Sequence, residues 1–226
     1  MSFILNIDTA SESAHVSIAK DGLVIQALYS ESQKEHASFL QTAIQQLAKL
    51  TGIKLTDIDA VAVTAGPGSY TGLRVGMASA KGLCYALQKP LITLNTLEVL
   101  AASAIHIFPK YKIEFLLCPM MDARRMEVFT AIYNSDLKIQ LAPCAMILDE
   151  SSFKNELANN KILFFGSGSA KWKPISEHTN AAFESVQILP QALSNLSYSL
   201  FLKNYFTDLV YSEPIYLKDF QTVNKP

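Results

Sequence analysis

Two short segments of the chain carry residue types that could bind a phosphate. Gly66, Gly68 and Ser69 follow a predicted buried strand and precede a predicted helix. Such a turn directs free backbone N–H groups and the positive end of the helix dipole toward an anion. Asp8 and Thr9 end the first predicted strand and could hold a hydrated magnesium ion or orient that loop. Neither segment matches a P-loop or a dinucleotide fingerprint, so a tight turn and a backbone-bonded strand end remain the alternatives.

The histidines and cysteines give no support for a metal centre. The four histidines include no H-x-x-x-H or H-E-x-x-H pair, and the three cysteines include no C-x-x-C pair. No G-x-S-x-G segment occurs, so a nucleophile elbow is not indicated either. We therefore expect no metal, no catalytic residue and free, buried thiols.

Composition indicates a folded protein with little affinity for nucleic acid by itself. The 226 residues are 50% hydrophobic and carry a formal net charge of -1. Such a chain can bury a full core, but it has no overall field that attracts phosphates. Asp8 interrupts the amino-terminal apolar run too early for a signal peptide, and no apolar run is long enough to span a bilayer. We expect a cytoplasmic protein without membrane contact.

The pattern along the chain predicts an α/β fold. Short apolar or alternating runs indicate strands, and apolar residues three and four positions apart indicate helices. The first hundred residues contain predicted strands at 3–7, 15–19, 23–29, 60–64 and 91–94, and predicted helices at 36–50, 73–87 and 97–105.

The second half repeats this layout weakly. An apolar run at 115–121 ends in Asp122, and a strand follows at 127–133. The same order occurs around Asp8. A run at 162–165 then enters a second glycine turn. Pro174 interrupts the helix expected after that turn, so the second unit looks degenerate.

This repeated pattern predicts two similar folding units. We place an amino-terminal domain at 1–103, which carries the partner-binding helices, and a smaller, degenerate domain at 104–226. An amphipathic stretch at 190–210 is the last predicted helix, and it is expected to pack back on the first domain.

Small residues recur every four positions on the helix that follows the first glycine turn. Gly72, Gly76 and Ala80 share one of its faces, and a glycine inside a helix costs roughly 0.5 to 1 kcal/mol relative to alanine. Another backbone is therefore expected to come close to this face. Both the chain's own sheet and a helix of a partner satisfy that requirement.

Three motifs resemble those of the TsaB family, namely residues 7–10 (IDTA), 66–76 (GPGSYTGLRVG) and 121–128 (MDARRMEV). The resemblance runs from the first strand to residue 217 and is weak between about 135 and 210. It implies the two-domain α/β fold of actin, hexokinase and Hsp70 (the ASKHA fold), with a degenerate second domain.

The resemblance also implies a function without catalysis. In the related TsaD family two histidines of a V-N-H-L-E-x-H segment hold a metal, whereas this chain has Thr96 and Leu100 at the matching positions. Neither side chain can supply an imidazole ligand. The implied role is a scaffold that dimerizes with a TsaD-like catalytic subunit for threonylcarbamoyl transfer to adenosine 37 of tRNA, assisted by a TsaE-like ATPase.

Further expectations about partners and ligands follow from the same resemblance. The chain forms a homodimer when alone, meets tRNA only through the complex, holds no cofactor of its own, and has ATP or ADP only at the complex interface. In this family the helices at about 36–50 and 70–87 pair with the same helices of a partner. The interface expected here consists of Leu40, Ile44, Gly72, Leu73, Gly76, Met77 and Ala80.

Two other functions compete with the scaffold. A small ATP-binding, kinase-like or peptidase-like enzyme would use Asp8 and the glycine turn for chemistry, and nucleotide turnover by the isolated chain would identify it. A stand-alone RNA-binding protein is opposed by the charge balance.

Overall fold

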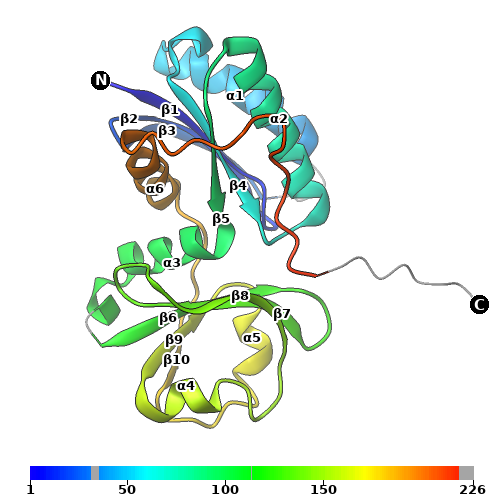
Figure 1. Ribbon diagram of the computed structural model, residues 1–226, viewed down its shortest axis with the longest axis vertical. Helices are drawn as coiled ribbons and strands as arrows, with labels where there is room; N and C mark the ends of the chain where they lie inside the picture. Colours follow the sequence, from blue (N-terminus) through cyan, green and yellow to red (C-terminus); the bar gives the residue numbers. More distant parts are fainter. Residues whose placement is uncertain (32–35, 113, 219–226) are drawn as a thin grey trace, which may run out of the picture.

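The computed structural model describes residues 1–31, 36–112 and 114–218. Its strands form two five-stranded sheets, one in each half of the chain (Figure 1). We call each sheet, with the helices that cover it, the first lobe and the second lobe. Among the described helices, none combines the length and apolarity of a bilayer-spanning segment.

The first sheet has the strand order β3-β2-β1-β4-β5. Strand β1 pairs antiparallel with β2 and parallel with β4. The β2–β3 hairpin turns at Asp21 and Gly22, which both have positive φ angles, as a tight hairpin requires. The strands are β1 (Phe3–Asp8), β2 (Ala14–Lys20), β3 (Leu23–Ser30), β4 (Ala60–Gly66) and β5 (Leu91–Asn95).

The second sheet repeats this topology. Its order, read from the opposite edge, is β8-β7-β6-β9-β10, and β6 pairs antiparallel with β7 and parallel with β9. The predicted duplication of an α/β unit is therefore confirmed. The strands are β6 (Phe115–Asp122), β7 (Glu127–Tyr133), β8 (Ile139–Ile147), β9 (Lys161–Phe165) and β10 (Ala181–Phe183).

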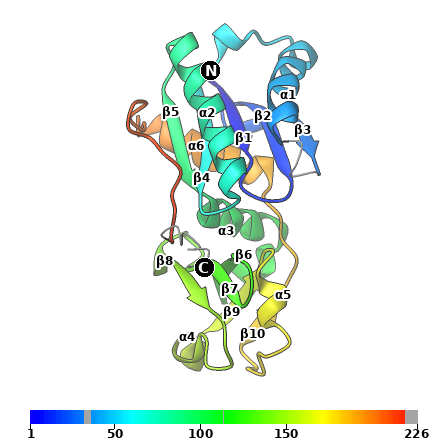
Figure 2. The same cartoon turned by 90° about the vertical axis from the view of Figure 1, so that its right-hand side faces the viewer.

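Helices cover both faces of the first sheet. Helices α1 (His36–Thr51) and α2 (Tyr70–Leu87) lie on one face, in front of the sheet in Figure 2. Helix α6 (Pro190–Leu202) packs on the other face, against β1, β3 and β5. Side chains alternate along β1 accordingly, so that Leu5 joins the core under α1 and α2 while Ile4 joins the core under α6.

The second lobe is covered less completely. Helix α3 (Thr96–Ile107) packs on one face of its sheet, and the short helices α4 (Lys154–Asn159) and α5 (Ser169–Trp172) lie beyond the other. Trp172 anchors an aromatic cluster there with Phe153, Phe164 and Phe183. Helix α5 has only four residues, as expected from the proline at position 174.

Helix α3 contacts both sheets, because it touches β4 and β5 as well as β6 and β7. Residues 103 and 104, between which we placed the domain boundary, both lie inside this helix. The boundary stays a prediction. A 3-10 turn, η2 (Leu55–Asp57), precedes β4, and another, η3 (Pro109–Lys112), follows α3.

The carboxyl-terminal segment, residues 203–218, returns to the first lobe and then reaches the second. Helix α6 ends at Leu202, so the predicted amphipathic stretch is helical only in its first part; Asn204 then has a φ angle of 52°. Thr207 bridges to Leu91 at the edge of the first sheet. The segment finally descends beside the β6–β7 hairpin (Figure 1), where Lys218 meets Glu127 at 2.7 Å.

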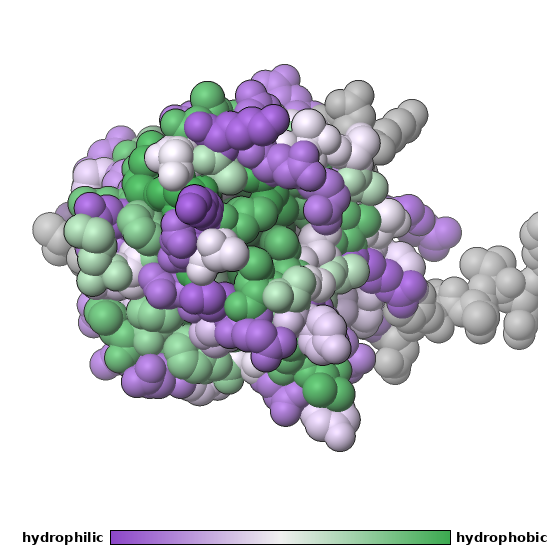
Figure 3. Space-filling model, turned by 90° about the horizontal axis from the view of Figure 1, so that it is seen from above, coloured by the Kyte–Doolittle hydropathy of each residue, from purple (hydrophilic) through white to green (hydrophobic). Residues whose placement is uncertain are grey.

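The end of the first lobe that lies away from the second lobe is shown from above in Figure 3. Apolar side chains gather in the middle of this view, and hydrophilic side chains surround them. The connection between α1 and β4 contributes half-buried Ile53 and Leu55, which pack against the core beneath α1 and α2.

Candidate functional site

Asp8 stands at the end of β1, inside the first lobe. Its side chain is 1% exposed. The carboxylate accepts hydrogen bonds from the Thr64 hydroxyl at 2.6 Å and from the Ala10 N–H at 3.2 Å. His15 Nδ1 lies 3.6 Å from its other oxygen, and burial lowers the pKa of His15 although the Asp8 charge opposes that shift. The buried Asp8 carboxylate therefore holds the end of β1 in place through contacts inside the first lobe.

The glycine turn after β4 packs directly against the turn after β1. The Ser69 N–H donates to the Ala10 carbonyl at 2.7 Å, and the Ser69 hydroxyl accepts from the Gly72 N–H at 3.2 Å as a helix cap. A Cβ atom on Gly68 would collide with the Ala10 carbonyl oxygen. The structure thus brings the five anion-site candidates together, but these polar groups bond to one another.

This packing explains why the inward face of α2 carries small residues. The Thr9 hydroxyl donates to the Gly72 carbonyl at 2.8 Å. A Cβ atom on Gly72 would collide with the Thr9 carbonyl oxygen, and one on Gly76 would collide with the Thr9 hydroxyl. The two glycines are needed because α2 approaches the chain's own β1–β2 turn, which is one of the two explanations left open by the sequence.

The expected partner interface requires a correction. All seven of its residues are buried within the chain itself, and the side chains among them pack into the hydrophobic core or against the glycine turn. They cannot touch a partner while the chain keeps this fold. The seven residues lie on the inward faces of the two helices, and a partner contact through these helices stays a prediction.

The outward face of α2 carries a second series of small residues that sequence reasoning missed. Ala78, Gly82 and Ala86 are exposed and recur every four positions. A Cβ atom on Gly82 would meet nothing within 4 Å. An exposed glycine inside a helix costs about 1 kcal/mol relative to alanine, and no packing within the chain requires it here. The four-residue spacing was the signal that could have identified this face.

Helix α1 extends this outward face without adding strong charge. Gln41 Nε2 donates to the Ser79 hydroxyl at 3.1 Å and so links the two helices. The cations of α2 are engaged elsewhere: Lys81 donates to the carbonyls of Val210 and Ser212, and Arg74 donates to the Tyr216 hydroxyl. The result is a largely uncharged surface across the two helices, which we call the α1–α2 face.

The second lobe presents its strand-end carboxylate differently. Asp122 ends β6 and is exposed; Lys171 Nζ lies 2.7 Å from its Oδ1, which also accepts from the Arg124 N–H at 2.6 Å. Partial burial raises the pKa of Asp122, but these hydrogen bonds outweigh burial and hold it below the ordinary value. The glycine turn after β9 packs against the end of β6, since the Gly168 N–H donates to the Met120 carbonyl at 2.8 Å and the Asp122 N–H donates to the Ser167 hydroxyl at 3.1 Å.

The two positions at which the resemblance implies the loss of metal-binding histidines lie in the first turns of α3. Thr96 and Leu100 are both buried, and a Cβ atom on Gly166 would press against the Leu100 side chain. Within the described ranges, no group of three or more His, Cys, Asp or Glu side chains could hold a metal. Glu98, between these positions, has a pKa raised by burial.

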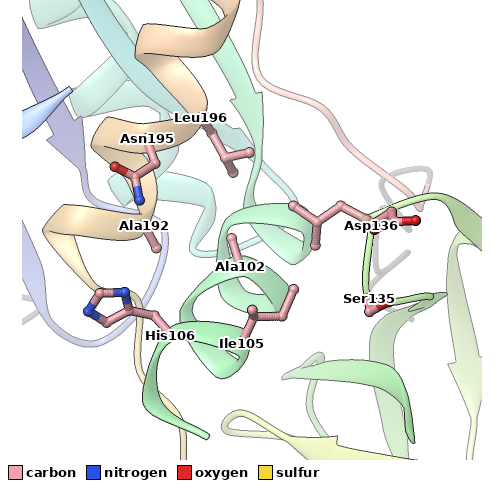
Figure 4. Close-up of a pocket in the computed structure, with 9 residues that line it drawn as sticks. Ala102, Ile105, His106, Ser135, Asp136, Ala192, Asn195 and Leu196 are labelled. Atoms are coloured by element: carbon pink, nitrogen blue, oxygen red, sulfur yellow. The ribbon is translucent and has the colours of Figure 1, made fainter. Parts of the chain in front are cut away.

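A shallow pocket lies on the other side of α3 (Figure 4). It opens between α3, α6 and the β7–β8 connection, and no predicted site residue lines it. Five of its nine lining residues are apolar and four are polar. The lining residues labelled in the figure are Ala102, Ile105, His106, Ser135, Asp136, Ala192, Asn195 and Leu196.

Solved structures share this architecture. A Pseudomonas aeruginosa protein described as similar to peptidase YeaZ superposes with a TM-score of 0.84 at 22% identity, covering 96% of this chain and 100% of that chain. An inorganic polyphosphate/ATP-glucomannokinase from an Arthrobacter strain superposes with a TM-score of 0.52 at 10% identity, covering 89% and 100%. At these identities the likeness concerns the fold, and it confirms the predicted ASKHA-like architecture.

Sequence comparison identifies the family as well as the fold. The model of a family described as TsaD, tRNA N6-adenosine threonylcarbamoyltransferase, matches residues 28–199. A tRNA threonylcarbamoyladenosine biosynthesis protein TsaB from Bacillus subtilis (strain 168) is 30% identical over 178 residues, which cover 77% of this chain and 75% of that protein. The protein of the same name from Escherichia coli (strain K12) is 27% identical over 226 residues, which cover 96% and 94%. The chain therefore carries the domain of the transferase family and belongs, within it, to the TsaB family.

Proposed function

We propose that this chain is a non-catalytic subunit that dimerizes with a TsaD-like catalytic subunit and activates it for threonylcarbamoyl transfer to adenosine 37 of tRNA. The names of the TsaB relatives support the pathway. The match of residues 28–199 to the transferase family supports the pairing, because two chains with one fold can present the same helix pair to each other across a pseudo-twofold axis.

The α1–α2 face is the proposed contact surface, and Gly82 is the observation that carries this proposal. Small side chains allow two helix axes to approach below the usual ~8 to 10 Å spacing. Gly82 has open space around its Cβ position, so a partner helix could pass close to its backbone. The inward glycines Gly72 and Gly76 allow α2 to pack against Thr9, whereas Gly82 faces outward and is available to a partner helix. The same face would form the homodimer when the chain is alone.

The absence of catalysis in this chain is part of the proposal. The Asp8 carboxylate and the Ser69 hydroxyl are both hydrogen-bonded within the first lobe, so neither stands ready for a substrate. We place ATP or ADP only at the interface with the catalytic partner, a TsaE-like ATPase as a further partner, and tRNA contact only within the complex. The cytoplasm, where tRNA is modified, is the proposed location.

The decisive experiment replaces Gly82 by leucine. Gly82→Leu adds bulk on the α1–α2 face and improves helix propensity by up to ~1 kcal/mol. We expect association with a TsaD-type transferase to weaken at least tenfold, tRNA modification to fall in parallel, and the melting temperature to stay level or rise. Sedimentation, a modification assay and a melting curve measure the three quantities.

Ser199→Leu on the exposed side of α6 is the matched control, because it adds similar apolar bulk away from the α1–α2 face. If Gly82→Leu and Ser199→Leu both associate like the wild type, the proposed surface is wrong. Modification that is equally fast with and without the chain would overturn the proposed function itself. Nucleotide turnover by the isolated chain would instead establish the kinase-like or peptidase-like alternative.

A further inference from the structure

The turn of the β6–β7 hairpin contains two adjacent arginines in an unusual backbone conformation. Arg124 has a φ angle of 70° and Arg125 one of 49°. Asparagine and glycine adopt such left-handed φ angles most readily. Side chains with a Cβ atom are strained there. We call these two residues the arginine tip.

The turn does not need the arginine side chains to form. The Arg124 N–H donates to Asp122 Oδ1 at 2.6 Å, and the Glu127 N–H donates to the Arg124 carbonyl at 3.1 Å. These bonds use only the backbone of the tip. Both arginines are exposed, and neither guanidinium makes an ion pair or hydrogen bond with any residue in the described part of the chain.

The two carboxylates that flank the tip within the hairpin are paired with lysines. Asp122 binds Lys171 Nζ at 2.7 Å, and Glu127 binds Lys218 Nζ at 2.7 Å. These ion pairs stand at the two strand ends that flank the turn. The hairpin and its two lysine partners therefore carry four cations against two carboxylates, in a chain whose formal net charge is -1.

The carboxyl-terminal segment brings aromatic surface to the same region. Tyr216 precedes Lys218 by two residues and packs against Tyr70, with 5.5 Å between ring centroids. The Arg74 guanidinium lies 3.9 Å from the centre of the Tyr70 ring and donates to the Tyr216 hydroxyl. Both tyrosines remain partly open to solvent, at 40% and 38% exposure.

We propose that the arginine tip contacts the phosphate backbone of the RNA that the complex modifies, an inference that rests on the proposed function. Exposed guanidinium groups release counterions when they meet a polyanion, and the half-exposed tyrosines of the segment that reaches the hairpin through Lys218 add aromatic surface on which bases can stack. A free nucleotide fits less well, because the tip residues line neither the pocket between α3 and α6 nor the one between β3 and α1. Because the chain has a formal net charge of only -1, it should bind RNA weakly alone. We expect the tip to add to the affinity of the catalytic partner for tRNA.

The test replaces Arg124→Asn and Arg125→Gly together in the complex with the transferase. These residues suit the turn, so the melting temperature should rise while RNA binding weakens. We expect tRNA affinity, measured by fluorescence anisotropy at several KCl concentrations, to fall severalfold. The slope of log K against log salt should decrease by about 1 to 2, because each lost phosphate contact removes ~0.7 to 0.9. Lys138→Asn, in the β7–β8 connection immediately before β8 and also exposed, is the matched control and should change neither quantity.

Several results would overturn the inference. One is an unchanged salt slope in the double variant when its assembly with the transferase, checked by sedimentation, is intact. A melting temperature that falls would show that the arginines stabilise the hairpin. A loss of ATP affinity without a loss of tRNA affinity would identify a nucleotide phosphate as the ligand. If modification still depends on the chain in each of these cases, the proposed function survives while this inference does not.

Discussion

Asp8 ends the central strand of the first sheet, and Asp122 ends the central strand of the second. Asp8 is buried against a hydroxyl, a backbone N–H and a histidine, whereas Asp122 is exposed and paired with a lysine. One topology thus supports two electrostatic environments. The difference shows that a repeated strand order fixes where a carboxylate stands, while the residues packed around it decide whether it serves the fold or faces solvent.

The glycine series on α2 should give the largest contrast. Gly72→Leu places a side chain against the Thr9 carbonyl oxygen, and such overpacking beside a fixed backbone should destabilise the chain by about 3 kcal/mol. Gly82→Ala, ten residues further along, should stabilise it by up to ~1 kcal/mol. Urea denaturation of both variants measures the difference. Equal stabilities would contradict the assignment of inward and outward faces.

The two carboxylates should respond differently to removal. Asp8→Ala leaves the Thr64 hydroxyl and the Ala10 N–H without their buried acceptor, which should cost about 2 to 3 kcal/mol. Asp122→Ala removes an exposed ion pair and should cost less than about 1 kcal/mol. The buried partners of Asp8 make this loss of stability clear, although Asp8 stands at the end of a strand. Similar unfolding free energies for the two variants would remove the distinction between the lobes.

The smallest effect concerns pH and His15. Burial lowers the pKa of His15 in the folded chain, so below about pH 6.5 the unfolded chain binds a proton that the folded chain resists. Stability should be constant above that pH and should fall as the pH drops below it, by at most ~1.4 kcal/mol per unit. His15→Gln should flatten this part of the profile. An unchanged slope between pH 5 and 6.5 in that variant would show that another group carries the dependence.

Much of the fold was predictable from local patterns. Alternating and helical periodicities located the strands around Asp8 and Asp122, and the repeated order of strand, carboxylate, turn and strand indicated the duplication that the two sheets display. Pro174 correctly limited the helix that follows the second glycine turn. These features depend on residues close in sequence, so one chain was enough to find them.

The site was less predictable because side-chain partners come from distant segments. The polar groups of Asp8 and Ser69 could equally have faced an anion, and only the packing of Thr64, Ala10 and Gly72 around them commits them to the fold. The left-handed backbone at Arg124 and Arg125 was likewise hidden, since nothing in the residue types of that turn requires it.

Sequence by itself determined the family, the two α/β units and the two helices that are candidates for a partner. Tertiary structure decided which face of those helices is available. Gly72, Gly76 and Ala80 form one series with four-residue spacing, and Ala78, Gly82 and Ala86 form another. Periodicity cannot rank two equal series on one helix. The Thr9 backbone and side chain, brought against the first series by the neighbouring strand, turn it inward and leave the second series open.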